Sequence, residues 1–192
     1  YVLLSKSTAP WCSLLNQVLS NPQIVDDFSL SSWGLLISQS RSAGLLVLVH
    51  DLLDRAGILD TVPDGPLNHL KSARILADKH LRDVRWEVRC ICDALKGHDQ
   101  PVILLKGAAY VMAGLPVAEA RLFSDVDILV AKSIINDVEQ TLRLKGWVSG
   151  AVDEYDDRYY RTWMHELPPL QHRIRNTVLD VHHNILPITA GL

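Results

Sequence analysis

The sequence predicts a protein of the α/β (α+β) class, in which a mixed sheet with flanking helices follows an N-terminal helical region. Apolar residues recur at helical spacing from the start of the chain to about residue 98. From residue 99 on, short aliphatic and β-branched runs alternate with helical segments, which is typical of a sheet covered by helices. We therefore expect a helical region at 1–98 and a second domain, truncated at its C-terminal end, at 99–192.

Two helices open the predicted order. The first ends near the breaker pair Asn21-Pro22. Its apolar positions are Leu14, Leu15, Val18 and Leu19. Ser31 and Ser32 offer N-caps for a second helix. This helix extends from Trp33 to Leu53 and stops at Gly57.

A turn and a long third helix follow. The segment VPDGP at 62–66 predicts a turn, because Pro and Gly both interrupt regular structure. The third helix runs from Leu67 to Leu95, with apolar residues at helical spacing between charged ones. We interpret the charged residues as a solvated face rather than as a binding surface. The polar segment KGHDQP at 96–101 is then the linker to the second domain.

The sequence pattern of the second domain predicts five strands and two helices. The strands are expected at 101–105, 126–130, 147–148, 170–174 and 177–182. The first of them is a short apolar run and is expected to be buried. One helix lies within 106–114, directly after this strand. Ser133 can cap the other helix, which Gly146 closes. Its apolar positions are Ile134, Ile135, Val138 and Leu142.

Composition and charge narrow the class of protein. A chain of 192 residues can bury one good-sized core, and its net charge of -3 argues against duplex DNA as a partner. The densest apolar run, Gly44–Val49, is far shorter than the ~20 residues that cross a bilayer, so no membrane contact is expected. The chain lacks an initiator Met and a basic leader, and it ends abruptly. We therefore expect a piece of a longer, cytoplasmic protein.

Three cysteines are present, and their spacing does not indicate a metal knuckle. Cys90 and Cys92 lie two apart in a helical stretch, where their side chains diverge and chelate one ion poorly. Together with Cys12, they are expected to be buried apolar thiols in a reducing compartment.

Two carboxylates in the stretch SDVDILV are the first chemical signal. Asp125 and Asp127 stand at the start of an otherwise apolar strand. Side chains at i and i+2 of a strand point to the same face, so the two carboxylates project together. Two converging carboxylates repel each other, and a divalent cation such as Mg²⁺ relieves that repulsion. The alternative is a merely polar strand entry, because D-x-D is common by chance.

A third carboxylate occurs in TVLDVHHNI. Asp180 lies in the middle of an apolar strand, where an acid is unexpected unless the strand borders a site. If this strand neighbours the VDILV strand, Asp125, Asp127 and Asp180 can hold two metal ions. One ion would activate an attacking hydroxyl, and the other would stabilise a leaving pyrophosphate.

The segment LLKGAAY offers a place for phosphate. A helix that starts at Lys106-Gly107 leaves backbone N–H groups free. Gly107 allows close approach, and Lys106 adds a point charge. A simple strand-to-helix turn with a surface lysine explains the same residues.

Four of the histidines lie near the C-terminal end of the chain: His165, His172, His182 and His183. His182 shares a face with Asp180 by alternation, so it can line the pocket or orient the carboxylate. His183 faces the other way and is expected to pack or lie at the surface. A zinc site would require these histidines to converge, and imidazole-type zinc chemistry rarely shares a site with carboxylate-type Mg²⁺ chemistry.

Together these residues resemble the DNA polymerase β-like nucleotidyltransferase superfamily. Within it, the chain is most similar to a bacterial group of uncharacterised nucleotidyltransferases. The shared pattern is a strand followed by Lys-Gly and a short helix, then Arg and a D-x-D strand, and later an acid-x-His strand. Here these segments read LLKGAAY, RLFSDVDILV and LDVHHNILP, in that order. The helical first half also resembles the N-terminal region of that group.

The resemblance implies roles for individual residues. Asp125 and Asp127 are implied to ligate Mg²⁺ (two ions, or Mn²⁺ in its place), and Asp180 to be the third ligand or a general base. Gly107 matches the glycine that faces the triphosphate. Arg121 matches a basic position that contacts phosphate or holds a loop.

One position departs from that pattern. The superfamily has Gly-Ser or Gly-Gly at the helix start, and this chain has Gly107-Ala108. The hydroxyl that contacts a phosphate is therefore missing, and Ser124 is a candidate substitute.

The leading functional hypothesis is an enzyme that moves a nucleoside monophosphate from a triphosphate such as ATP to the hydroxyl of an unknown acceptor. A second hypothesis is an inactive nucleotidyltransferase fold that serves as a nucleotide-binding or protein-binding module. A third is a zinc hydrolase that uses the C-terminal histidines. Fold does not by itself choose among them.

Overall fold

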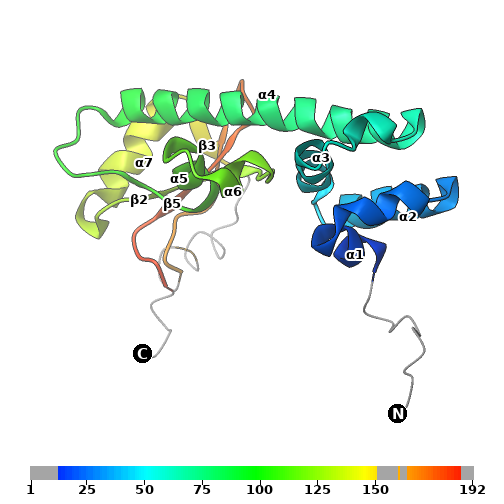
Figure 1. Ribbon diagram of the computed structural model, residues 1–192. Coiled ribbons are helices and arrows are strands. Elements are labelled where there is room, and N and C mark those ends of the chain that lie inside the picture. The colour runs from blue at the N-terminus through cyan, green and yellow to red at the C-terminus, as the bar shows by residue number, and fades with distance from the viewer. Residues whose placement is uncertain (1–12, 151–159, 161–163, 187–192) are drawn as a thin grey trace, which may run out of the picture. The chain divides into compact units, whose positions relative to one another are not determined.

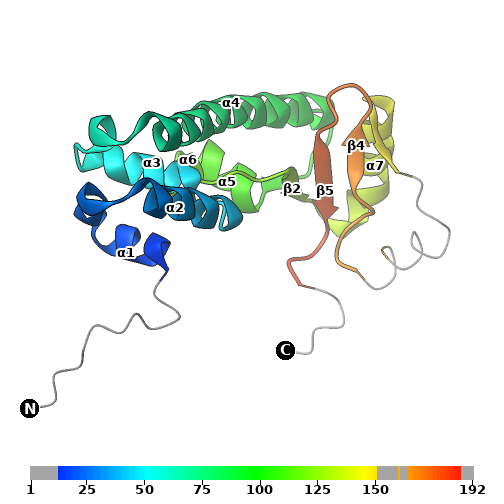
Figure 2. The same ribbon diagram turned by 90° about the vertical axis from the view of Figure 1, so that its right-hand side faces the viewer.

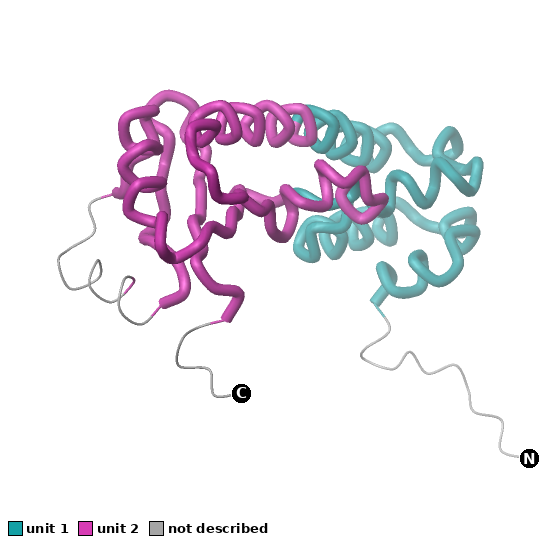
Figure 3. Tube along the Cα trace, turned by 90° about the vertical axis from the view of Figure 1, so that its left-hand side faces the viewer, with its two compact units in different colours: residues 1–79, 119–122 teal, residues 80–118, 123–192 magenta. Residues whose placement is uncertain are grey.

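The computed structural model describes residues 13–150, 160 and 164–186. The chain divides into two compact units, which Figure 3 colours separately. The first unit comprises residues 1–79 and 119–122, and the second comprises residues 80–118 and 123–192. The expected domain boundary near residue 98 stays a prediction.

The first unit is helical, as expected from its periodicity (Figure 1). Its elements are α1 (Leu14–Ser20), η1 (Pro22–Asp27), α2 (Leu30–Ser42), α3 (Leu46–Arg55), η2 (Leu59–Thr61) and the first part of α4 (Asp64–Leu95). They bury one apolar cluster, whose most enclosed members include Val18, Leu36, Val49, Leu53 and Leu70. The burial of this cluster stabilises helices that are individually too short to persist in water.

The expected single helix from Trp33 to Leu53 is wrong, because the chain makes two helices there. Gly44 adopts φ +69°, and the N–H of Leu45 bonds the carbonyl of Ser40 at 2.7 Å. This left-handed cap ends α2 before α3 begins. The N-cap of α2 is Ser29, not Ser31 or Ser32, and its Oγ accepts from the N–H of Ser32. Gly57, with φ +71°, ends α3 as predicted.

The turn expected at 62–66 is only half correct. Val62 and Pro63 are not helical, but Asp64–Pro66 already form the first turn of α4. Proline is compatible with a first helical turn, because the N–H groups there need no partner within the helix. The carboxylate of Asp64 also favours that position, since it lies near the positive end of the helix dipole.

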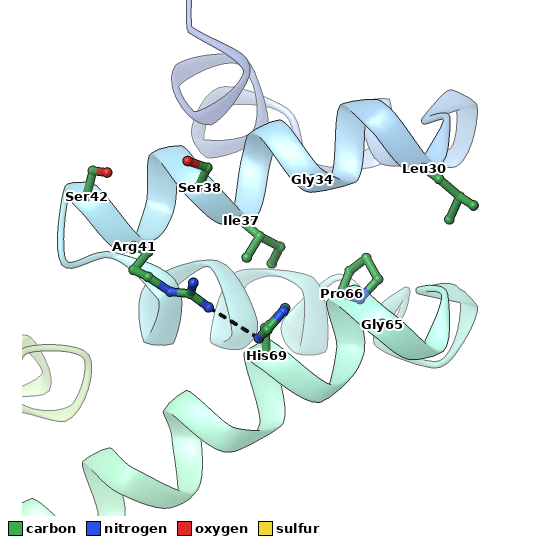
Figure 4. A pocket seen from close by; sticks show the side chains of 9 residues that line it. All are labelled: Leu30, Gly34, Ile37, Ser38, Arg41, Ser42, Gly65, Pro66 and His69. Carbon is green, nitrogen blue, oxygen red and sulfur yellow. Dashed lines mark hydrogen bonds between the residues drawn. The ribbon is translucent and has the colours of Figure 1, made fainter.

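An open hollow of about 410 Å³ lies between α2 and the start of α4 (Figure 4). Arg41 from α2 and His69 from α4 point toward each other, and their nitrogens lie 3.2 Å apart. The hollow is lined by Leu30, Gly34, Ile37, Ser38, Arg41, Ser42, Gly65, Pro66 and His69. It contains none of the residues that the sequence singled out.

The second unit contains a five-stranded mixed sheet, as predicted (Figure 2). The remaining elements are β1 (Ile103–Leu104), α5 (Lys106–Met112), α6 (Pro116–Glu119), β2 (Asp125–Leu129), η3 (Lys132–Ile134), α7 (Ile135–Leu144), β3 (Trp147–Ser149), β4 (Leu170–His172) and β5 (Val178–His182). The strand order is β1-β2-β5-β4-β3. β2 and β5 are parallel, and every other neighbouring pair is antiparallel.

The register of β2 and β5 gives the sheet two unlike faces. Asp125 pairs with Val178, and Asp127 pairs with Asp180. Paired residues share a face, so the acidic residues of both strands project on one side. The other side carries Val126, Ile128, Leu179 and Val181, which join the second part of α4 in one apolar cluster. The core of this unit therefore lies on the face opposite the carboxylates.

The turn between β4 and β5 is tied to α4 by a two-pronged ion pair. Arg175 donates from Nε and Nη2 to the two carboxylate oxygens of the buried Glu87, at 2.8 and 2.9 Å. Its guanidinium also lies over the ring of Trp147. Glu87 raises the pKa of Arg175, chiefly through these hydrogen bonds. This pair secures the start of β5 and hence the position of Asp180.

Three smaller expectations in the second unit are wrong. The first strand is not a buried run from 101 to 105, because β1 has only two residues and Ile103 is half exposed at the sheet edge. Ser133 does not cap a helix, since it lies inside η3. The fourth strand ends at His172 rather than Ile174, because a tight turn with Asn176 at φ 56° begins there. Gly146 closes α7 as predicted.

The cysteines are less buried than expected. Cys90 is partly buried and Cys92 is exposed; both are free thiols within the described ranges, and Cys12 lies outside the described residues. They diverge because two residues along α4 turn a side chain from the sheet toward solvent. Across the described residues, no helix combines the length and the apolar character that a membrane crossing requires.

Candidate metal centre

The parallel pairing of β2 and β5 brings the three predicted carboxylates together. Asp125, Asp127 and Asp180 each offer an oxygen, and these oxygens all lie within 4.8 Å of one another. Asp127 is 2% exposed, while the other two are partly buried. The condition set by the sequence, that the strand of Asp180 neighbours the VDILV strand, is therefore met.

Asp180 has an unusual electrostatic environment. Its Oδ1 is buried and has no hydrogen-bond partner among the described residues. Burial, together with the negative charges of Asp127 and Asp125, raises the pKa of Asp180 to about 6. A buried carboxylate oxygen without a partner costs about 1–3 kcal/mol. A bound cation would remove both penalties, so these residues fit a divalent metal ion.

Lys106 contacts the carboxylates rather than standing apart from them. Its Nζ donates a hydrogen bond to Oδ1 of Asp127, and this bond raises the pKa of the lysine. Lys106 also has φ 45°, a left-handed conformation that is strained for a residue with a Cβ. The side chain is 62% exposed, so the ammonium is both paired with Asp127 and accessible to a ligand from solvent.

The helix start at Gly107 is shaped by packing. A Cβ at position 107 would lie 2.6 Å from Cγ of Phe123, so the phenyl ring requires glycine there. Phe123 in turn packs edge-on against His80. The next side chain, Ala108, is fully buried in the core cluster. A serine at position 108 would therefore face the core.

His182 connects Asp127 to a glutamate that the sequence did not single out. Its Nε2 lies 2.9 Å from Oδ1 of Asp127, and its Nδ1 lies 3.1 Å from Oε2 of Glu166. The sequence predicted that His182 lines the pocket or orients Asp180, whereas the carboxylate that it contacts on this face is Asp127. Glu166 stands in the segment HELPPLQH, whose likeness to a segment of the same family and whose His165 were the signals that could have drawn attention to it.

Of the remaining predicted residues, Ser124 lies beside Asp125, whereas Arg121 belongs to the other compact unit. Ser124 is exposed and lines a hollow of about 270 Å³ together with Asp125, Phe123 and Thr177. Arg121 is exposed and belongs to the other compact unit, so its contact with phosphate stays a prediction. His183 is partly buried at the opposite side of β5, beside a hollow of about 220 Å³ that Lys132 and Glu166 also line. Burial and the charge of Lys132 lower the pKa of His183.

A mixed sheet with three carboxylates on adjacent parallel strands defines a candidate divalent-metal centre. Residues 29–191 match the family described as uncharacterised nucleotidyltransferase. The chain therefore belongs to this family. No curated protein and no solved structure matches the chain.

Proposed function

We propose that this protein is a Mg²⁺-dependent nucleotidyltransferase that moves a nucleoside monophosphate from a nucleoside triphosphate to the hydroxyl of an acceptor. The observation that carries the proposal is the convergence of Asp125, Asp127 and Asp180 on one face of the sheet. Membership of an uncharacterised nucleotidyltransferase family agrees with it. We also place the family within the DNA polymerase β-like superfamily, on the order of its LLKGAAY, RLFSDVDILV and LDVHHNILP segments.

Asp125, Asp127 and Asp180 are the residues that would hold Mg²⁺. Oxygen ligands at this spacing suit Mg²⁺, which takes one or two carboxylates together with substrate phosphates. When bound, the ion neutralises charge on the triphosphate and polarises the reacting oxygen. Mn²⁺ accepts the same ligands and could replace it.

The chain's own residues supply orientation and proton transfer. His182 holds Oδ1 of Asp127 in place through its hydrogen bond, and Lys106 fixes the same oxygen from the solvent side. Lys106 is also exposed enough to contact a phosphate oxygen. Asp180, whose pKa is about 6, is deprotonated at neutral pH and can accept the proton of an acceptor hydroxyl. Ser124 and the hollow beside Asp125 form a place for part of the substrate.

The competing proposal is a catalytically inactive module that binds a nucleotide or a protein. One observation favours it: Lys106 already pairs with Asp127, and its ammonium competes with a metal ion for that carboxylate. Against it, all three carboxylates remain, and Ala108 is buried in the core instead of facing a phosphate. An enzyme therefore remains the better supported proposal.

The test is Mg²⁺-dependent binding and turnover of nucleoside triphosphates by the purified chain. Calorimetry with a non-hydrolysable triphosphate should show binding that disappears when EDTA removes Mg²⁺. Replacing Asp125 and Asp127 with Asn should abolish it, because the ligand charges are lost while side-chain size is kept. Thr141→Ser, at an α7 position outside the proposed site, is the matched control and should bind as the native chain does.

Two outcomes would decide against the enzyme. Triphosphate binding that survives in the double Asn variant would remove the carboxylates from the site. Binding that depends on Mg²⁺ but yields no pyrophosphate with any of a panel of sugar, nucleotide, peptide and RNA acceptors would favour the inactive module.

A further inference from the structure

A second group of side chains that could ligate a metal ion lies next to the three carboxylates and is linked to them by the hydrogen bond between His182 and Asp127. His165, Glu166 and His182 each offer a ligand atom, and these atoms lie within 4.8 Å of one another. The rings of the two histidines are tilted by only 31° and their centroids are 5.3 Å apart. None of the three was assigned to metal binding in the proposed function.

The backbone holds these residues in place. Glu166 forms an antiparallel bridge with His182. The N–H of His183 bonds the carbonyl of His165 at 2.8 Å. The next residue, Leu167, donates its N–H to the carbonyl of Val181 and is buried in the core. The segment that carries His165 and Glu166 is therefore fixed against the end of β5.

The two ring nitrogens of His182 contact different carboxylates. Nε2 donates a hydrogen bond to Oδ1 of Asp127, because a carboxylate can only accept. Nδ1 faces Oε2 of Glu166 at 3.1 Å. An imidazole nitrogen and a carboxylate oxygen are both ligand atoms for a divalent transition-metal ion.

His165 has a buried ring nitrogen that lacks a partner. This atom, Nδ1, has no hydrogen-bond partner among the residues that the structure describes. A metal ion that His165 ligates through Nδ1 would satisfy it. The 3.1 Å separation of Nδ1 and Oε2 is also close to the edge of a tetrahedral zinc site, about 3.3 Å for the usual bond lengths.

We propose that His165, Glu166 and His182 form a second metal site, which takes a divalent transition-metal ion such as Zn²⁺. Two imidazoles and one carboxylate suit zinc better than Mg²⁺, which prefers oxygen ligands alone. Asp127 then accepts a hydrogen bond from the ligating His182 and orients its ring. The site lies beside the carboxylate centre, shares no ligand with it, and does not depend on nucleotidyl transfer.

Zinc titration of the full chain in competition with a chromogenic chelator tests this site without nucleotide. The native chain should bind one Zn²⁺. His165→Ala and Glu166→Gln should each weaken zinc binding by at least about 100-fold. Residues that only support a ligand contribute up to about 100-fold, and a ligand itself should contribute at least as much. Asp127→Asn should weaken binding by about 10- to 100-fold, as expected for a residue that only orients a ligand. Thr141→Ser, outside both groups of metal-ligating side chains, should bind Zn²⁺ as the native chain does.

Two controls keep the result clear. Circular dichroism melts of the metal-free variants show whether each one folds. If His165→Ala does not fold, Glu166→Gln still tests the site, because it keeps the shape of the side chain. The spectrum of the Co²⁺-substituted chain should lack the thiolate charge-transfer band that the cysteines would produce.

The outcomes separate this proposal from the function proposed above. Zinc binding that survives in folded His165→Ala and Glu166→Gln, or that disappears in Thr141→Ser, would overturn the second site. An absence of stoichiometric zinc binding would also overturn it. Mg²⁺-dependent triphosphate binding is measured separately, and its failure would not affect the zinc result.

Discussion

Each face of the β2–β5 pair has a buried side chain near its centre, yet these two side chains gain stability in opposite ways. Ile128 on one face is 0% exposed, and Asp127 on the other is 2% exposed. The apolar face gains stability simply by leaving water. A buried carboxylate gains nothing from that and must find partners, which here are Lys106 and His182.

The difference teaches that burial alone does not define a core. On the apolar face a substitution should change the free energy of unfolding and leave ligand binding intact. On the acidic face it should change binding more than stability, because the carboxylates of Asp125 and Asp180 remain mutually repulsive until a cation arrives. Four predictions test that separation, from the largest expected effect to the smallest.

Ile128→Ala should lower the free energy of unfolding by about 2–5 kcal/mol, because it opens a cavity in a fully buried position. Urea unfolding followed by circular dichroism measures the loss. Ile103→Ala, at the half-exposed sheet edge, is the control and should cost far less. Mg²⁺ affinity of the folded Ile128→Ala chain should equal that of the native chain; a large drop would mean that the two faces are not separable.

Asp127→Asn should weaken Mg²⁺-dependent triphosphate binding by about 100-fold or more, equivalent to about 2.7 kcal/mol. The change removes a ligand charge and the acceptor shared by Lys106 and His182. Calorimetry measures the affinity. Ile128→Val, one residue along on the opposite face, is the matched control, and equal losses in the two variants would contradict the assignment.

Mg²⁺ affinity should fall as pH drops through about 6, by up to about tenfold per pH unit, because the metal must then displace a proton. The pKa of Asp180 is raised from 3.8, so the metal-free chain should lose stability as pH rises from about 4 to about 6. Mg²⁺ titrations between pH 5 and 8 measure the first effect and melting curves the second. Asp180→Asn should flatten both profiles; unchanged profiles would assign the titration to another group.

Lys106→Gln should have the smallest effect, and its sign should differ between ligands. Free Mg²⁺ should bind more tightly, by less than about fivefold, because Lys106 no longer competes for Asp127 and solvent screens the 62% exposed lysine. Mg²⁺-triphosphate should bind less tightly, since a phosphate contact is lost. Calorimetry with each ligand measures the pair of changes, and Lys132→Gln serves as the control. Changes of the same sign for both ligands would show that Lys106 does not contact the triphosphate.

Several parts of the site could be predicted from single patterns. The pairing of Asp125 with Asp127 follows from the two-residue period of a strand, and the helix after Lys106 follows from the turn that precedes it. The position of Asp180 within an apolar run was itself an indication, because burying an acid is costly. These signals are local, and local geometry is what a sequence reports most directly.

Other features needed the assembled sheet. No spacing in the chain shows that Phe123 covers Gly107, because the contact depends on how a loop lies against a helix start. The break at Gly44 was missed for a related reason, since the apolar period continues through it and only the left-handed cap ends the helix.

The sequence by itself determined the alternation of acidic and apolar residues on β2 and β5, and with it the existence of one polar and one apolar face. Only the tertiary structure decided that these strands are parallel neighbours in the register that opposes Asp127 to Asp180. It also decided that Glu166 reaches His182. The physical reason is that side-chain direction follows from the backbone of each strand alone, whereas register depends on long-range hydrogen bonds and packing.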